Sequence, residues 1–110
     1  MEKKTTQQEK LEMVFAAVDK LKQDLNKATQ ITKEGKVLSM ISAGYAITWA
    51  IVNKKLVRHV YGENESLMPA DELYSHFFPE AGSILYRIGL NGGEQIRGYI
   101  FLMNIKKEAK

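Results

Sequence analysis

Bulky and small side chains alternate through the uncharged stretch of residues 37–53. The bulky members of its second half are Tyr45, Ile47, Trp49 and Ile51. Because successive side chains of an extended chain point to opposite faces, this alternation predicts a strand with one bulky and one small face. A single helix is the competing interpretation, since apolar residues here also recur at three- and four-residue steps. The β-branched and aromatic content favours two strands, at 36–41 and 45–52.

Residues 6–31 have a helical period instead. Their apolar side chains recur at alternating three- and four-residue steps, at Leu11, Val14, Val18, Leu21, Leu25 and Ala28. These positions also fit the a and d sites of a coiled coil, but for only about two and a half heptads, whereas sustained coiled coils need three or four. The pattern therefore predicts one long helix docked on a sheet.

Turn-forming residues divide the second half of the chain into short elements. A third strand is predicted at 56–61, after a hairpin turn, and a loop at 62–66. A proline followed by acidic and apolar residues predicts a short helix at 69–77. Alternating apolar residues on either side of an Asn-Gly-Gly turn predict a final hairpin, with strands at 83–90 and 95–105.

The register of the final hairpin depends on the length of its loop. A four-residue loop at 91–94 pairs Tyr86 with Tyr99, whereas a three-residue loop places Arg87 opposite Arg97. Like charges that lie directly opposite each other destabilise a sheet. The four-residue loop is therefore the predicted one.

Together these elements predict an α+β fold of order α-βββ-α-ββ, formed as a single domain by residues 1–110. The simplest arrangement is one antiparallel sheet with the long helix packed across one face. The small residues would let that helix approach closely; they are Ser42, Gly44, Ala46, Thr48 and Ala50. The bulky face would then be covered only in part, by the short helix.

An uncovered apolar face predicts a binding or self-association surface. Antiparallel sheets usually present polar residues to solvent, and large exposed apolar patches mark sites of interaction. We expect a small non-enzymatic binding or regulatory protein that takes a second copy, another protein or a small planar ligand on this face. A homodimer is favoured over a monomer covered by its two helices. The expected contact residues are Tyr45, Ile47, Trp49, Ile51, Tyr86, Tyr99, Phe101 and Met103.

The composition changes this picture little. The chain is 45% hydrophobic and 26% charged, as is typical of a folded globular protein. The absence of cysteine excludes disulfides and thiolate metal sites, and with no signal sequence visible we expect a cytoplasmic protein. The stretch at 37–53 is too short and too polar to span a membrane, which takes about 20 predominantly apolar residues.

A formal net charge of +3 permits contact with an anionic partner. Nucleic-acid binding is therefore an alternative function, in which sheet aromatics stack on bases and basic residues contact phosphate. The basic candidates are Lys54, Lys55, Arg58, Arg87 and Arg97. No recognisable motif orders these residues, and a solvated basic turn is the simpler interpretation.

The chain offers little material for catalysis, with two histidines and no cysteine. Glu72 and His76 stand four residues apart on the predicted short helix, where they could bind a metal together with His59. An ordinary side-chain pair on that helix is the favoured interpretation. Phosphate-binding, dinucleotide-binding, serine-nucleophile and zinc-protease motifs are absent from the sequence. We therefore expect no enzyme, no metal and no cofactor.

Two segments resemble parts of a PAS sensory domain. The sequence Gly-Glu-Gln-Ile-Arg-Gly-Tyr, continued as far as residues 104–107, resembles the closing strands of that family, and residues 47–60 resemble its opening hairpin. This resemblance spans about a third of the chain and implies a truncated sensory ligand-binding module, without site residues to carry over. Asn104 stands where the family usually has aspartate.

Overall fold

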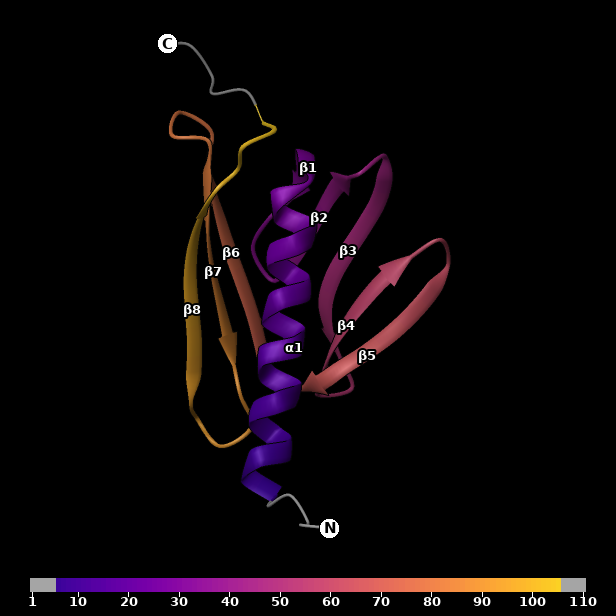
Figure 1. The fold of residues 1–110 in the computed structure, drawn as a ribbon, viewed down its shortest axis with the longest axis vertical. Coiled ribbons are helices and arrows are strands. Elements are labelled where there is room, and N and C mark those ends of the chain that lie inside the picture. Colours follow the sequence, from indigo (N-terminus) through magenta and orange to yellow (C-terminus); the bar gives the residue numbers. More distant parts are fainter. Residues whose placement is uncertain (1–5, 106–110) are drawn as a thin grey trace.

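One helix and eight antiparallel strands make up residues 6–105, the part of the chain that the computed structural model describes (Figure 1). Helix α1 (Thr6–Asn26) comes first. Five strands then form one sheet in chain order: β1 (Ala28–Lys33), β2 (Val37–Ser42), β3 (Tyr45–Val52), β4 (Lys55–Val60) and β5 (Glu63–Pro69). The last three form a second sheet: β6 (Glu72–Phe78), β7 (Ser83–Gly89) and β8 (Gln95–Phe101). The α+β class is thereby confirmed, but two sheets replace the single predicted sheet.

Helix α1 lies between the two sheets, and the core forms around it (Figure 1). Its apolar stripe buries Leu21 and Leu25 completely. The five-stranded sheet adds Leu38 and Trp49 from its inner face, and the three-stranded sheet adds inward-facing residues of β7 such as Ile84. A helix has one apolar stripe and each sheet has one apolar face. Packing α1 between the two sheets buries all three of these apolar surfaces against one another. No helix among residues 6–105 is long and apolar enough to cross a membrane.

Helix α1 occupies the bulky face of β3, and the prediction that it packs on the small face is wrong. Ile47 and Trp49 are 3% and 0% exposed, whereas Ala46 is exposed. The helix packs against both sheets rather than closely against one. Large side chains therefore fill the space between α1 and β3, and small residues are not required there. The buried indole also finds a polar partner on the helix, described below.

The predicted helix over 6–31 ends at Asn26, and its last turn is instead strand β1. Ala28 is fully buried and continues the apolar period, which is why the pattern extended the helix. The following residues include β-branched Thr29 and Ile31, which favour strands. Strand β2 offers this segment a partner, with Ile31 opposite Met40. Tertiary pairing therefore overrides the helical period at this point.

The predicted loop at 62–66 and short helix at 69–77 are both wrong, because β5 and β6 occupy these positions. Leu73 and Ser75 are buried while Tyr74 and His76 are exposed, which is the two-residue period of a strand. Strand β6 pairs with β7 along its whole length. Pro69 ends the edge strand β5, a position where the missing N–H costs no ladder bond.

The predicted strands at 36–41, 45–52 and 56–61 are confirmed to within one residue as β2, β3 and β4. The helical alternative for this stretch is thereby excluded. The final hairpin is also confirmed, although β8 ends at Phe101 rather than at residue 105.

The register of the final hairpin is the one that places Arg87 opposite Arg97, so the predicted pairing of Tyr86 with Tyr99 is wrong. Tyr86 lies opposite Gly98, and its ring covers that glycine. A Cβ atom at position 98 would lie 2.1 Å from Tyr86 Cζ, so only glycine fits beneath the ring. Packing of a large buried ring outweighs the repulsion between two arginines at the surface.

Candidate functional site

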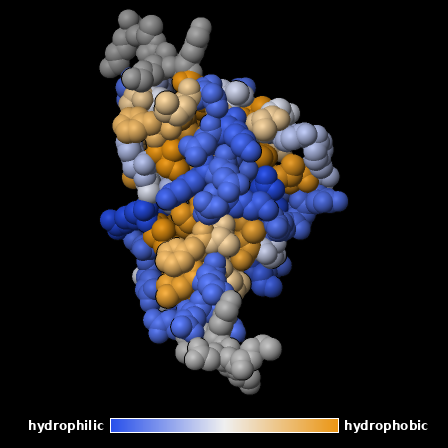
Figure 2. Space-filling model, in the orientation of Figure 1, coloured by the Kyte–Doolittle hydropathy of each residue, from blue (hydrophilic) through white to orange (hydrophobic). Residues whose placement is uncertain are grey.

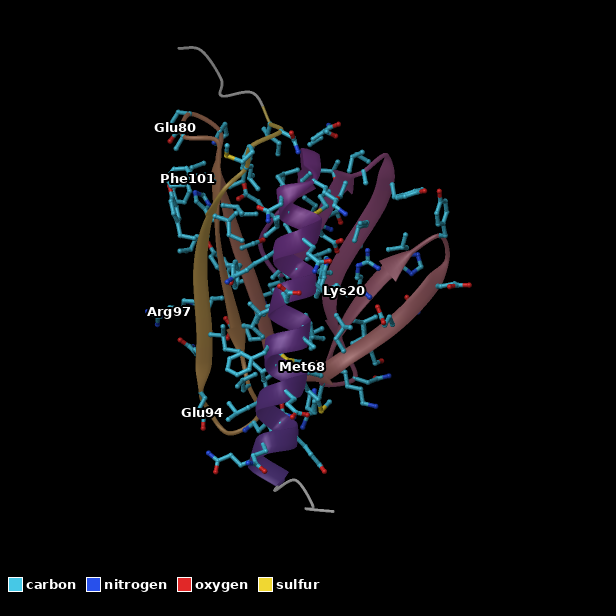
Figure 3. The ribbon with its side chains drawn as sticks, viewed as in Figure 1. Lys20, Met68, Glu80, Glu94, Arg97 and Phe101 are labelled. Carbon is cyan, nitrogen blue, oxygen red and sulfur yellow. The ribbon has the colours of Figure 1, made fainter. Side chains whose placement is uncertain are left out.

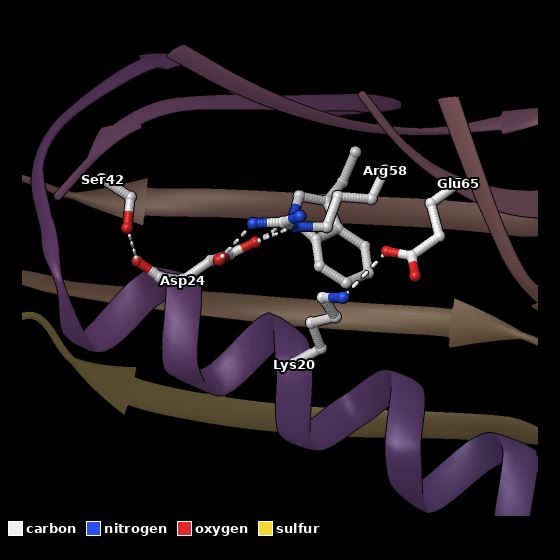
Figure 4. A network of polar contacts seen from close by, with 6 residues as sticks. Lys20, Asp24, Ser42, Arg58 and Glu65 are labelled. Carbon is white, nitrogen blue, oxygen red and sulfur yellow. Dashed lines mark hydrogen bonds and ion pairs between the residues drawn. The ribbon is translucent and has the colours of Figure 1, made fainter. Parts of the chain in front are cut away.

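A buried polar network joins α1 to the five-stranded sheet (Figure 4). The Asp24 carboxylate accepts hydrogen bonds from Trp49 Nε1 at 2.9 Å and from Arg58 Nε and Nη2 at 2.8 and 3.1 Å. Ser42 Oγ donates to the backbone oxygen of Asp24 at 2.6 Å. The hydrogen bond to Asp24 raises the pKa of Arg58, against the opposing effect of burial. This network anchors the helix, so Trp49 and Arg58 are structural rather than surface residues.

The outer side of the three-stranded sheet carries a group of aromatic residues. Residues that pair directly across an antiparallel sheet share one face. Pairing therefore sets His76, Leu85 and Tyr99 in one row of this face. The whole group, called the aromatic face below, consists of Tyr74, His76, Phe78, Leu85, Arg87, Arg97, Tyr99 and Phe101. Arg97 and Phe101 project away from α1 in Figure 3.

The rings at one end of the aromatic face pack against one another. Tyr99 meets Phe101 edge-on, with 5.4 Å between ring centroids, and lies 6.2 Å from Phe78. The Tyr99 and Ser83 hydroxyls are hydrogen-bonded at 2.5 Å. Tyr99 and Phe101 nevertheless remain 49% and 61% exposed. The cluster is thus held in place by its own contacts while most of its apolar surface faces outward.

The two arginines of the aromatic face differ in their partners. Arg87 forms an ion pair with Glu72 at 2.6 Å and lies over the Tyr74 ring, 5.1 Å from its centroid. Arg97 Nη2 donates to the neutral side chain of Gln95 at 3.0 Å, and no carboxylate pairs with it among residues 6–105. The aromatic cluster is therefore bordered by one guanidinium whose charge is not neutralised locally.

The structure distributes the other predicted contact residues over different places. Tyr45 packs edge-on against Tyr61, with centroids 5.0 Å apart, on the five-stranded sheet. Ile51 is half-buried and Tyr86 is buried. Met103 follows β8 and is exposed. Of the eight predicted residues, Tyr99 and Phe101 lie together on the aromatic face.

The five basic candidates are likewise separated. Lys54 and Lys55 lie at the turn between β3 and β4, and Arg58 turns inward to Asp24. Arg87 and Arg97 share the outer side of the other sheet. These cations do not form one surface.

The histidines do not assemble a metal site. His59 Nδ1 lies 2.6 Å from the Asn64 side-chain oxygen, and His76 Nδ1 lies 3.3 Å from a Glu34 carboxylate oxygen. Glu72 and His76 lie on a strand rather than on a helix. Across residues 6–105 there is no cluster of three histidine, aspartate or glutamate side chains that could hold a metal ion.

Sequence reasoning missed the contribution of β6 to the aromatic face. The predicted helix at 69–77 includes Tyr74 and stops one residue before Phe78, so neither residue is expected on the sheet face that carries Tyr99. The alternation of exposed and buried positions along β6 appears only in the folded structure, because apolar and polar residues do not alternate in the sequence of residues 72–78.

A second apolar surface borders the N-terminal half of α1 and was also missed. Figure 2 shows hydrophobic surface on both sides of the polar residues of α1. Leu11, Met13 and Phe15 are exposed on the helix. A groove of about 340 Å³ lies beside Met13 and is also lined by Met68, from β5.

Burial raises the pKa of Tyr86 above the usual tyrosine value. The unfolded chain therefore loses this proton first, at about pH 10, while the folded protein keeps it. We expect the contribution of Tyr86 to the free energy of unfolding to be complete below about pH 10 and to fall as the pH rises further. Urea denaturation of the wild type and of Tyr86→Phe at a series of pH values measures this effect. The difference between the two proteins at neutral pH is the control, and a difference that stayed constant into the alkaline range would contradict the expectation.

No protein-family model, curated protein or solved structure matches this chain. The two hairpins that resemble PAS domains lie in different sheets, since residues 47–60 belong to the five-stranded sheet and residues 95–101 to the other. Residues 106 and 107 of that resemblance lie outside the described part of the chain.

Proposed function

We propose that this protein is a non-enzymatic protein-binding module whose recognition surface is the aromatic face of β6, β7 and β8. The observation that carries the proposal is the exposure of Tyr99 and Phe101 on the outer side of a sheet. Such a side is usually polar. Burial of a large aromatic side chain is worth about 1.5 to 3 kcal/mol. These rings therefore offer substantial binding energy to a partner.

The shape and composition of the face favour a protein partner over a small ligand. Small-molecule sites are usually concave and enclose most of their ligand. The aromatic face is one side of a sheet and contacts a ligand from one direction. Tyrosine, phenylalanine and arginine are enriched where proteins bind each other. Arg97 adds a preference for a partner that sets a carboxylate beside its apolar patch.

Nucleic-acid binding has less support in the arrangement of charges. The ion pair with Asp24 engages Arg58 on the inner side of the other sheet. Arg87 is paired with Glu72. Arg97 is then the one cation on the aromatic face without a carboxylate partner among residues 6–105, which is little charge for a nucleic-acid backbone.

Photo-crosslinking tests the proposal in the cells that produce the protein. A benzophenone amino acid at position 101 should crosslink a specific protein, identified by mass spectrometry. The same amino acid at position 61 is the matched control, because Tyr61 is a 78% exposed aromatic residue in the turn between β4 and β5 of the other sheet. Equal crosslinking from both positions, or crosslinks to nucleic acid, would overturn the proposal.

Binding of the purified partner then measures the contribution of the aromatic face. We expect Phe101→Ala to weaken binding about tenfold or more, since truncation of an aromatic hot-spot residue costs about 2 kcal/mol or more and about 1.4 kcal/mol is tenfold in affinity. Tyr61→Ala should leave the affinity unchanged. Isothermal titration calorimetry of the three proteins provides the measurement, and an unchanged affinity of Phe101→Ala would contradict the assignment.

A further inference from the structure

Strand β8 differs from the other edge strands of the two sheets. Strand β1 is interrupted by register shifts, and β5 carries two glutamates and ends in proline. The edge of β6 is covered, because Gly35 and Ser75 exchange two backbone hydrogen bonds of 2.9 Å. Bulges, charges, proline and covering segments are the devices that keep edges from pairing with other chains. Strand β8 has none of these among residues 6–105, apart from the single charge of Arg97 (Figure 1).

The hairpin of β7 and β8 decides which backbone groups reach this free edge. Leu102 N–H donates to Gly82 O and Leu90 N–H donates to Glu94 O, both at 2.7 Å. Pairs that exchange hydrogen bonds alternate with pairs that do not along an antiparallel ladder. The even-numbered residues of β8 therefore bond to β7. The N–H and C=O groups that point away from β7 belong to Gln95, Arg97, Tyr99 and Phe101.

We propose that β8 pairs with β8 of a second copy of this chain, in antiparallel orientation and centred on Gly98. In this register Arg97 lies opposite Tyr99 of the second copy, and Gln95 lies opposite Phe101 of the second copy. All four residues with outward-pointing backbone groups then exchange hydrogen bonds across the new ladder. Strand addition of this kind gains its affinity from main-chain bonds.

The side chains select this register over its neighbours. It sets each arginine beside an aromatic ring, a favourable cation–π pair. On the inner face it sets Ile96 opposite Ile100 of the second copy. A register centred on Arg97 would oppose two arginines, and one centred on Tyr99 would place Gln95 beyond the end of the other β8. The strand is thus complementary to itself, which is what a two-fold dimer requires.

The resulting dimer would have a six-stranded sheet with both aromatic faces on the same side. The two-fold axis stands perpendicular to the sheet at Gly98, so the two Tyr99 residues flank it, whereas the two Phe101 residues lie at opposite ends of the new ladder. This goes beyond the proposed protein-binding function, since the pairing uses the backbone edge of β8 and requires no other protein.

Two substitutions of one residue test the pairing with opposite expected results. Tyr99→Arg places arginine opposite Arg97 in both halves of the ladder, and we expect the dissociation constant to rise tenfold or more. Tyr99→Glu removes the same ring and hydroxyl but creates two opposite-charge pairs, so the dimer should persist. The double variant Arg97→Glu with Tyr99→Arg should restore the dimer. Sedimentation equilibrium of the purified full chain over a range of concentrations measures all four proteins.

Amide hydrogen exchange gives a second readout on the wild type. The amides of Arg97, Tyr99 and Phe101 should be protected at high protein concentration and should exchange rapidly on dilution. A wild type that stays monomeric at every concentration would overturn the proposal. So would a dimer in which Tyr99→Arg associates as tightly as the wild type, or in which these amides exchange rapidly.

Discussion

Replacement of Asp24 by alanine is expected to lower the free energy of unfolding by about 3 to 5 kcal/mol, a large part of the stability of a chain this size. The substitution leaves the Arg58 guanidinium without the carboxylate that it contacts at 2.8 and 3.1 Å. It also leaves the fully buried Trp49 indole N–H without its acceptor. Trp49 is the only tryptophan, so urea denaturation followed by its fluorescence reports on the same site.

Two further variants show whether the loss of stability comes from the broken ion pair or from an alanine substitution in α1 as such. Asp19→Ala is the matched control, because Asp19 is an exposed carboxylate of the same helix; its effect should stay within about 0.5 kcal/mol. Arg58→Met added to Asp24→Ala should recover stability, since it removes the unpaired charge. If the double variant were less stable than Asp24→Ala alone, the ion pair would not be the source of the loss.

Gly98→Ala is expected to destabilise the protein by about 2 to 3 kcal/mol through overpacking. The new methyl group would lie 2.1 Å from Cζ and 2.3 Å from Oη of Tyr86. Tyr86 is only 2% exposed, so its ring has little room to move aside. Urea denaturation at low protein concentration measures the loss without a contribution from self-association.

The effect of Gly98→Ala should depend on the Tyr86 ring. In a Tyr86→Leu background the same substitution should cost less than about 1 kcal/mol, which gives a large coupling energy in a double-mutant cycle. Gly89→Ala is the matched control on the neighbouring strand; its methyl group would lie 3.1 Å from Cβ of the exposed Glu72. Equal losses for Gly98→Ala in both backgrounds would show that contact with the ring is not the cause.

The sequence predicts that an apolar, aromatic sheet face is exposed, but it identifies only some of the residues on that face. Tyr99 and Phe101 were identified because apolar residues alternate with others along their strand and nothing in the sequence covers them. Trp49 shows the same alternation but is buried. The two-residue alternation of side chains shows that the two faces of a strand differ. It does not show which of the two faces another element will cover.

The local elements of β2, β3 and β4 followed from the chain itself. Their two-residue period, β-branched residues and turn-forming residues act over a few neighbours, and these local preferences agree with the final fold. Local preferences likewise predict helix α1 as far as Asn26. The α+β class can therefore be predicted without information on tertiary contacts.

Pairing between distant segments decided the rest. Thr29 and Ile31 became a strand because β2 was available, and residues 72–78 became β6 because β7 was available. Tyr86 covers Gly98 and so sets a hairpin register that local charge argued against. Asp24 accepts from both Trp49 and Arg58, which fixes the bulky side of β3 against the helix. Local sequence specifies which backbone conformations are favourable, but burial and hydrogen bonding between remote residues choose among faces and registers of similar local energy.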